Sequence, residues 1–191
     1  MLRAAEPAPD PSVAESSTAL SQLGQTWPVD GRTVGIVVDP DGDLPALGAV
    51  RRALLAAGAV PLVVGPTGGT LPDGTAVRRT FLTGRSMELD AVVLIGRPVP
   101  AADAVPARDA KAGEPSGPGL DPRVSLMLDK AFRHCKVLGG LGEGRDALCD
   151  AGYTDAVPGV LAGDDADELA GSLLELMSHH RVGERFATRV S

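Results

Sequence analysis

Thr33-Val-Gly-Ile-Val-Val38 is the stretch that decides the fold. It is short, apolar and rich in β-branched residues, which is typical of a strand buried on both faces of a sheet. A helical pattern follows over residues 43–57, with its apolar side chains on one stripe. Asp43 can cap the start of this helix, and Gly58 is typical of the position just after a helix end. A strand followed by an amphipathic helix predicts a parallel β-α-β unit.

The same alternation of apolar runs and amphipathic helices continues along the chain. Asp73-Gly74 predicts a small hairpin, and Pro158 favours an edge position for the last strand. The sequence therefore predicts an α/β fold, a flavodoxin-like doubly wound parallel sheet in a three-layer sandwich. Further strands are expected at residues 59–64, 91–95, 137–140 and 156–161, and further helices from residue 121, at residues 144–151 and from residue 164 or 165 to about 180.

The chain divides into a tail and one domain. Residues 1–30 are rich in proline near their start and are expected to form a flexible linker, with Trp27 packed on the folded body. Residues 31–191 are expected to form the flavodoxin-like domain. Within it, residues 97–121 hold five prolines and three glycines. A loop of this length and composition is expected to be a disordered or functional insertion.

Composition excludes several classes of protein. The 191 residues carry a net charge of −7, which disfavours nucleic acid or an anionic membrane surface as a partner. No apolar stretch is long enough to span a bilayer, and residues 1–10 lack the apolar segment of a secretory signal. Cys135 and Cys149 lack zinc-site spacing and fit a reducing compartment. We therefore expect a cytoplasmic protein, and its excess of Ala, Gly, Pro and Arg is typical of a high-GC bacterial genome.

The glycine-rich turn between the predicted strand at residues 137–140 and the next helix is the most informative candidate site. A tight turn of this kind presents the nucleophile in many α/β enzymes, and it needs Ser or Cys at its tip beside a general base. Here the tip candidates are Gly140, Leu141 and Gly142, none of which can attack a carbonyl. We therefore expect a vestigial nucleophile elbow and no catalytic residue.

The remaining loops show no cofactor signature. Residues 39–43 carry three aspartates and match neither a Rossmann glycine motif nor a P-loop. They could bind Mg²⁺, but a solvated acidic turn is the preferred interpretation. Two adjacent histidines, His179 and His180, point apart on a helix and cannot share a metal. Aromatic residues are too scarce to favour a flavin site. We therefore predict neither a metal site nor a cofactor site in this chain.

Several stretches resemble the C-terminal domain of large-subunit (clade 2) haem catalases. The likeness covers about residues 17–186, and its more specific parts are the hairpin with the TFLTG that follows it, DAVVLIG at 90–96 and MSHHRVGER at 177–185. The other stretches are GRTVGIVVDPDGD at 31–43, ALLAAGAVPLVV at 53–64, KAFRHCKVLGGLGEG at 130–144 and DAVPGVLAGDDADELAGSLLELMSHHRVGER at 155–185.

The resemblance also implies a wider superfamily. The catalase domain is similar to PfpI-like, class I glutamine amidotransferase-like proteins, which share the flavodoxin-like sandwich. Enzymes of that group carry a Cys at the turn that corresponds here to about Leu141, with an acidic partner from the loop after the first strand. Asp43 is the nearest candidate for that partner, but the Cys is absent. The resemblance therefore implies no protease, deglycase or amidotransferase activity.

Catalase chemistry is implied for the parent family and not for these residues. The family's haem lies in a β-barrel core upstream, with a distal His and Asn and a proximal Tyr, and the whole enzyme is a homotetramer that disproportionates hydrogen peroxide. Tyr153 lacks the arginine-containing context of the haem ligand. The first hypothesis is therefore a non-catalytic accessory domain that supports stability and haem access. Its expected partner is a catalase core domain or its own homo-oligomer.

A second hypothesis is a free-standing PfpI-like protein with a chaperone-like role. It predicts an exposed apolar groove, or a reactive thiol at Cys135 or Cys149. The first hypothesis instead predicts a surface that docks on the catalase core. Leu20, Leu23 and Trp27 would then belong to that docking surface.

Overall fold

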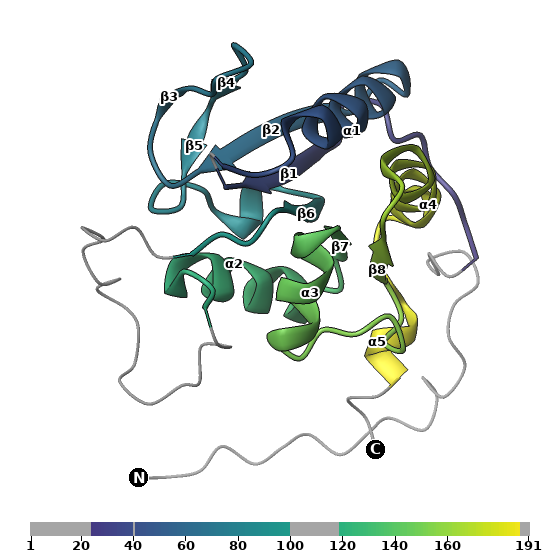
Figure 1. Cartoon of the computed structure of the whole chain (residues 1–191). Helices are drawn as coiled ribbons and strands as arrows, with labels where there is room; N and C mark the ends of the chain where they lie inside the picture. Colours follow the sequence, from purple (N-terminus) through teal and green to yellow (C-terminus); the bar gives the residue numbers. More distant parts are fainter. Residues whose placement is uncertain (1–23, 40, 100–118, 188–191) are drawn as a thin grey trace, which may run out of the picture.

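The computed structural model describes residues 24–39, 41–99 and 119–187 (Figure 1). A six-stranded sheet, a two-stranded hairpin and five helices make up this part of the chain. The elements in chain order are β1 (Thr33–Val38), α1 (Leu44–Ala56), β2 (Val60–Gly65), β3 (Gly69–Thr70), β4 (Ala76–Val77), β5 (Arg79–Thr80), the 3₁₀ turn η2 (Ser86–Glu88), β6 (Ala91–Ile95), α2 (Pro122–Arg133), β7 (Val137–Leu141), α3 (Glu143–Asp150), β8 (Val160–Gly163), α4 (Ala166–Ser178) and α5 (Glu184–Ala187).

The large sheet is parallel throughout, with strand order β5-β2-β1-β6-β7-β8. Its five longer strands, numbered as they occur in the chain, read 2-1-3-4-5, which is the flavodoxin order. The short strands β3 and β4 pair antiparallel as a separate hairpin around Asp73 and Gly74. The predicted doubly wound α/β fold with a small hairpin is confirmed.

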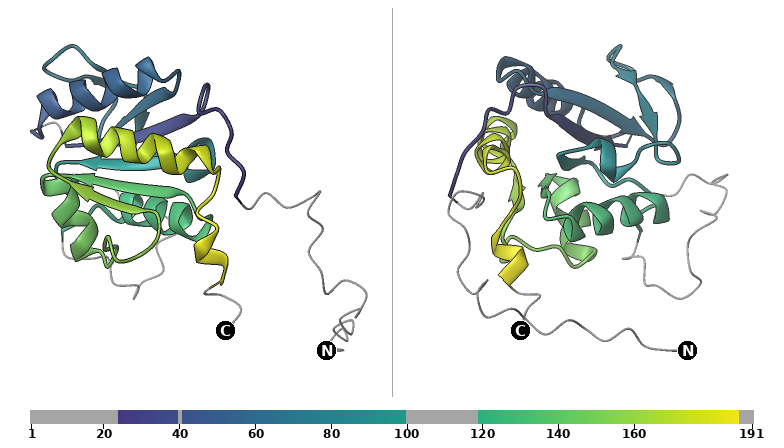
Figure 2. Two further views of the ribbon diagram at one scale, coloured as in Figure 1. Left: turned by 90° about the vertical axis from the view of Figure 1, so that its right-hand side faces the viewer. Right: turned by 180° about the vertical axis from the view of Figure 1, so that it is seen from behind.

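Helices cover both faces of the sheet (Figures 1 and 2). Alternate side chains of β1 point to opposite faces, as the two-residue period of a strand requires. Val34, Ile36 and Val38 join one apolar core with residues of α1 and α4, whereas Val37 joins the other with residues of α2 and α3. Because both faces are buried, the strand contains no polar residue after Thr33, and this explains the continuous apolar run in the sequence.

Aspartate caps fix where the helices start. Asp43, Asp121 and Asp165 each accept a backbone N–H from the first turn of α1, α2 and α4. Asp121 is fully buried, and Arg123 donates to both of its carboxylate oxygens at 2.8 and 2.6 Å. Gly58, with φ +77°, ends α1 as expected.

Two short elements and one boundary differ from the sequence expectation. The last strand begins at Val160 and not at residue 156, because Pro158 has no N–H to donate to a ladder and Gly159 adopts φ +76°. The strand nevertheless occupies the edge of the sheet, as predicted. The two-residue strand β5 and the short helix α5 were not expected.

The predicted insertion has closely spaced ends. The carbonyl of Pro98 accepts the N–H of Asp121 at 2.8 Å, and Arg97 pairs with Asp150 at 2.7 Å. Residues 100–118 of the insertion, and residues 1–23 of the expected linker, lie outside the described residues. Trp27 is half-buried, and its N–H donates to the carbonyl of Ser178 at 2.8 Å.

Lys136 joins the start of β7 to the turn before β6. Its side chain is buried, and its ammonium donates to the carbonyls of Ser86 and Leu89. Removal from water lowers the pKa of Lys136, and nearby Arg181 lowers it further. The folded state therefore bears a desolvation cost whenever this lysine is protonated.

The stability of the domain should consequently depend on pH through Lys136. The unfolded lysine titrates near its ordinary pKa of 10.5, and the folded one at lower pH. Between these values the unfolded chain binds a proton that the folded chain does not, so the free energy of unfolding contributed by Lys136 rises with pH. Urea unfolding from pH 7 to 10.5 should show the wild-type protein gaining stability relative to Lys136→Met. If the difference in free energy of unfolding between the wild-type protein and Lys136→Met stays constant across this pH range, the lowered pKa of Lys136 is wrong.

Candidate functional site

The turn between β7 and α3 consists of one residue. Leu141 ends the strand, Glu143 begins the helix, and Gly142 between them has φ +54° and ψ −122°. L-amino acids rarely adopt this backbone conformation, and it reverses the chain sharply. A strained strand-to-helix turn of this kind is the backbone geometry that α/β enzymes use to expose a nucleophile.

The glycines on either side of Gly142 are required by packing. A Cβ at Gly140 would lie 2.6 Å from the Cα of Arg145, and one at Gly144 would lie 2.2 Å from the carbonyl oxygen of Leu94. A Cβ at Gly142 would meet no atom within 4 Å. The central position therefore opens into free space, while its two neighbours hold the helix tightly against the sheet.

The geometry places the tip of the turn at Gly142, whereas the resemblance pointed to about Leu141. Leu141 is buried and lies within β7. The spacing Gly140-x-Gly142-x-Gly144 matches the G-x-S-x-G signature with glycine in the central position. That spacing was visible in the sequence and would have identified the tip without a structure.

Contacts to the adjacent strand hold the turn in place. The N–H of Gly142 donates to the carbonyl of Gly163 at 3.1 Å. Arg145 binds Asp164 at 2.6 Å and Asp146 at 3.1 Å, and these carboxylates raise the pKa of its guanidinium. The ion pair with Asp164 ties the start of α3 to the loop after β8.

Asp43 lies at the same edge of the sheet, after β1, with β6 between its strand and β7. Its side chain is exposed and accepts the N–H of Ala46 at 2.9 Å. The carboxylate therefore acts as the cap of α1. Within the same loop, Asp39 accepts the N–H of Asp41 at 3.1 Å.

The thiols and the tyrosine lie away from the turn. Cys135 is buried just before β7, and Cys149 is exposed in α3. The ring of Tyr153 packs on Phe132 with centroids 5.1 Å apart, and its hydroxyl donates to Asp129. Burial, together with Asp129, raises the pKa of Tyr153, so the phenol stays neutral near pH 7.

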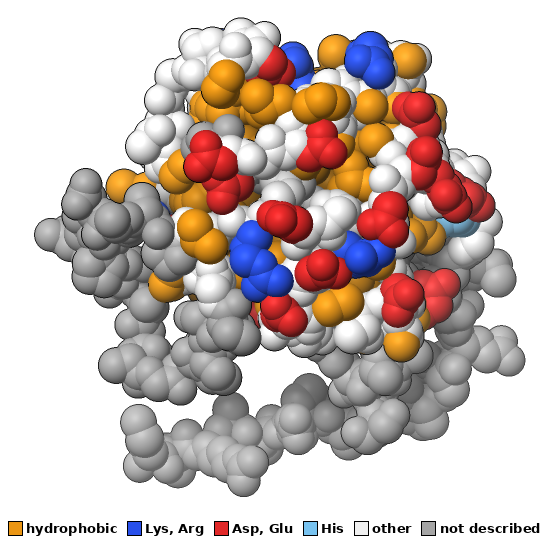
Figure 3. All heavy atoms as spheres, in the orientation of Figure 1, with side chains coloured by type: hydrophobic (Ala, Val, Ile, Leu, Met, Phe, Trp, Pro, Cys, Tyr) orange, Lys and Arg blue, Asp and Glu red, His pale blue; other side chains and the backbone are white. Residues whose placement is uncertain are grey.

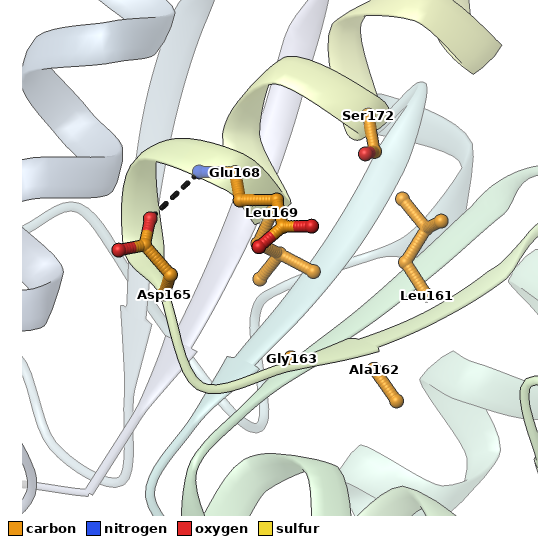
Figure 4. A pocket seen from close by; sticks show the side chains of 7 residues that line it. All are labelled: Leu161, Ala162, Gly163, Asp165, Glu168, Leu169 and Ser172. Carbon is orange, nitrogen blue, oxygen red and sulfur yellow. Dashed lines mark hydrogen bonds between the residues drawn. The ribbon is translucent and has the colours of Figure 1, made fainter.

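A small pocket of about 100 Å³ lies along the edge strand β8 and helix α4 (Figure 4). Asp165 in its wall accepts the N–H groups of Asp167 and Glu168, so its carboxylate is used as a helix cap. Glu168 and Ser172 supply the other polar side chains of the lining. Apolar Leu161 and Leu169 complete a shallow groove beside the sheet edge.

The described part of the chain contains neither a cluster of metal-binding side chains nor a helix that could cross a membrane. Residues 24–39, 41–99 and 119–187 contain no group of three or more His, Cys, Asp or Glu that could hold a metal ion. None of the helices in these same segments has the length and apolar character needed to cross a bilayer. Acidic side chains are spread across the face shown in Figure 3, with basic ones among them.

Comparison with known proteins gives one family. A family model for the C-terminal domain found in long catalases matches residues 30–187, which is most of the chain and nearly all of the described residues. No curated protein shows a significant match.

Alanine at two helical glycines should have opposite effects on stability. Gly144→Ala would place a methyl group against the carbonyl of Leu94 and should lower the free energy of unfolding by about 1–3 kcal/mol. Gly171→Ala lies inside α4, where a Cβ meets nothing within 4 Å, and should raise it by roughly 0.5–1 kcal/mol. Urea unfolding of both variants measures the difference. Equal effects would argue against tight packing of the turn on β6.

Proposed function

This chain belongs to the family of C-terminal domains found in long catalases, and from that premise we propose that it is a non-catalytic accessory domain. In this role it attaches to the catalase core, supports the stability of the enzyme and shapes access to the buried haem. The observation that carries the proposal is the residue at the tip of the β7–α3 turn. The backbone there has the geometry of a nucleophile elbow, but Gly142 has no side chain that could react.

The surroundings of Gly142 support the loss of an earlier catalytic role. Gly140 and Gly144 keep the turn closely packed, so the shape persists for structural reasons alone. Asp43, the nearest counterpart of an acidic partner, serves as a helix cap. We therefore interpret the turn as a vestigial elbow, a feature of the fold that the domain retains without the chemistry.

Haem does not fit the one tyrosine of this chain. A tyrosine that ligates haem iron does so through its phenolic oxygen. The hydroxyl of Tyr153 is instead bound to Asp129, and its raised pKa disfavours the phenolate. We therefore place the haem of the parent enzyme in the catalase core, and the contribution of this domain is mechanical.

The construction of the domain suits such a role. Its sheet is buried on both faces by its own helices, so the domain carries a complete core of its own. A rigid body of this kind can brace a neighbouring domain, or the subunits of a homo-oligomer, without refolding.

Addition of the chain to a catalase core should slow heat inactivation. A core prepared without its C-terminal domain would be heated with and without an equimolar amount of the 191-residue chain, and residual disproportionation of peroxide measured. We expect longer retention of activity with the chain, and no peroxide consumption by the chain alone. An unrelated acidic protein of similar mass is the control. Peroxide consumption by the chain alone, or no protection, would overturn the proposal.

A thiol placed at the vestigial elbow should be unusually reactive. Gly142→Cys puts a thiol at the start of α3, and Gly152→Cys puts one just after the end of the same helix, also at positive φ with no atom within 4 Å of the Cβ. The helix N-terminus lowers a thiol pKa, whereas the C-terminus does not. Both variants would be made in a Cys149→Ser background. The thiol of Gly142→Cys should react faster with a thiol reagent at pH 7 than the thiol of Gly152→Cys. Equal rates would show that the turn does not activate a nucleophile.

A further inference from the structure

We propose that the catalase core docks on the amino edge of the sheet, the edge at which β1, β2, β6, β7 and β8 begin. This inference rests on the proposed function and names the surface through which the domain would act. The docking face combines exposed apolar side chains with basic ones. Its members are Trp27, Leu55, Val60, Met87, Arg32, Arg85, His180 and Arg181.

Exposed apolar side chains gather at this edge. Leu55 lies in the last turn of α1, Val60 is the first residue of β2, and Met87 lies in the turn before β6. Their exposed fractions are 56%, 46% and 80%. The topology brings the end of α1 and the starts of β2 and β6 to one edge, because each helix runs back antiparallel to its strand. A methionine exposed to this degree contributes little to the fold and is adaptable in an interface.

Basic side chains lie at the same edge as the apolar ones. Arg181 lies 3.9 Å from Asp90, and Asp90 also accepts the N–H of Thr33 at 3.0 Å, so this carboxylate is already engaged. Burial lowers the pKa of His180, and the positive charges of Arg181 and Arg32 lower it further. Asp30 and Glu88 are exposed at the same edge, so the face carries charges of both signs although the whole chain carries −7.

The opposite, carboxyl edge of the sheet is acidic. Asp39, Asp41 and Asp43 follow β1, Glu143 follows β7, and Asp164 follows β8. Helix polarity favours this separation, since anions are stabilised at helix N-termini and cations at helix C-termini. An acidic partner surface would thus be repelled from the carboxyl edge.

The path of the chain identifies the occupant. Residues 24–32 run along the amino edge, where Trp27 donates to the carbonyl of Ser178 and the N–H of Gly31 donates to the carbonyl of Gly58 (Figure 2). In a long catalase this domain is C-terminal, so the chain that leaves the catalase core enters the domain through residues 24–32. A core tethered at this edge is present there at high effective concentration. The preferred contact is therefore an apolar patch on the core whose rim carries charges of both signs.

Two double variants with the same change of charge test the face. Met87→Glu with Arg85→Glu alters exposed residues at the amino edge, and Leu82→Glu with Arg78→Glu alters exposed residues beyond it, next to β5. Binding of each to a catalase core that lacks its own C-terminal domain would be measured by biolayer interferometry. We expect the amino-edge pair to weaken binding at least tenfold and the matched pair less than twofold.

The outcomes separate this inference from the proposed function. If the unmodified chain does not bind the core, the proposed function fails and the docking face with it. If the unmodified chain binds while both double variants weaken binding equally, or while only Leu82→Glu with Arg78→Glu weakens it, the docking face is wrong and the accessory role stands. Sedimentation of the chain alone gives a further check. Loss of a self-associated state in the amino-edge pair, with core binding unchanged, would assign the face to a second copy of the chain and overturn the inference.

Discussion

Burial of the sheet on both faces is the constraint from which the other features of the domain follow. The residues of β1, β6 and β7 have almost no exposed surface, so each face needs its own helical layer. Once both faces are covered, the ends of the strands reach the surface at two opposite edges of the sheet. The Gly142 turn lies at one of these edges, and the face that we propose for docking lies at the other.

If the Gly142 turn is a vestigial elbow, as we propose, the fold retains the form of a site without its chemistry. In an enzyme, the central residue of such a turn reacts while its neighbours only permit close packing. Here the neighbours, Gly140 and Gly144, still meet backbone atoms at short range. Their replacement would disturb the contact between α3 and the sheet, whereas a Cβ at the central residue, Gly142, would meet no other atom within 4 Å. Persistence of the turn is thus explained by packing, with no need for selection on catalysis.

Much of the fold could be predicted from the sequence because its signals are local and strong. The apolar run at residues 33–38 became β1 with the same limits, and Asp43 and Asp121 cap their helices as expected. The two-residue strand β5 escaped prediction because it is too short to show a period and depends on pairing with β2. The start of β8 was misplaced because an apolar run does not reveal where proline and left-handed glycine interrupt a ladder. The backbone dihedrals of Gly142 identify it as the tip of the turn, and the spacing of the three glycines in the sequence points to the same residue.

The short hydrogen bond between Pro98 and Asp121 has an evolutionary and a practical consequence. It holds the two ends of the segment between β6 and α2 next to each other, so that segment joins the rest of the domain at two neighbouring positions. The entropic cost of closing such a segment grows only slowly with its length. Drift in its length or composition is thus nearly silent for the rest of the domain. The same position is a natural place to graft a reporter or an affinity tag.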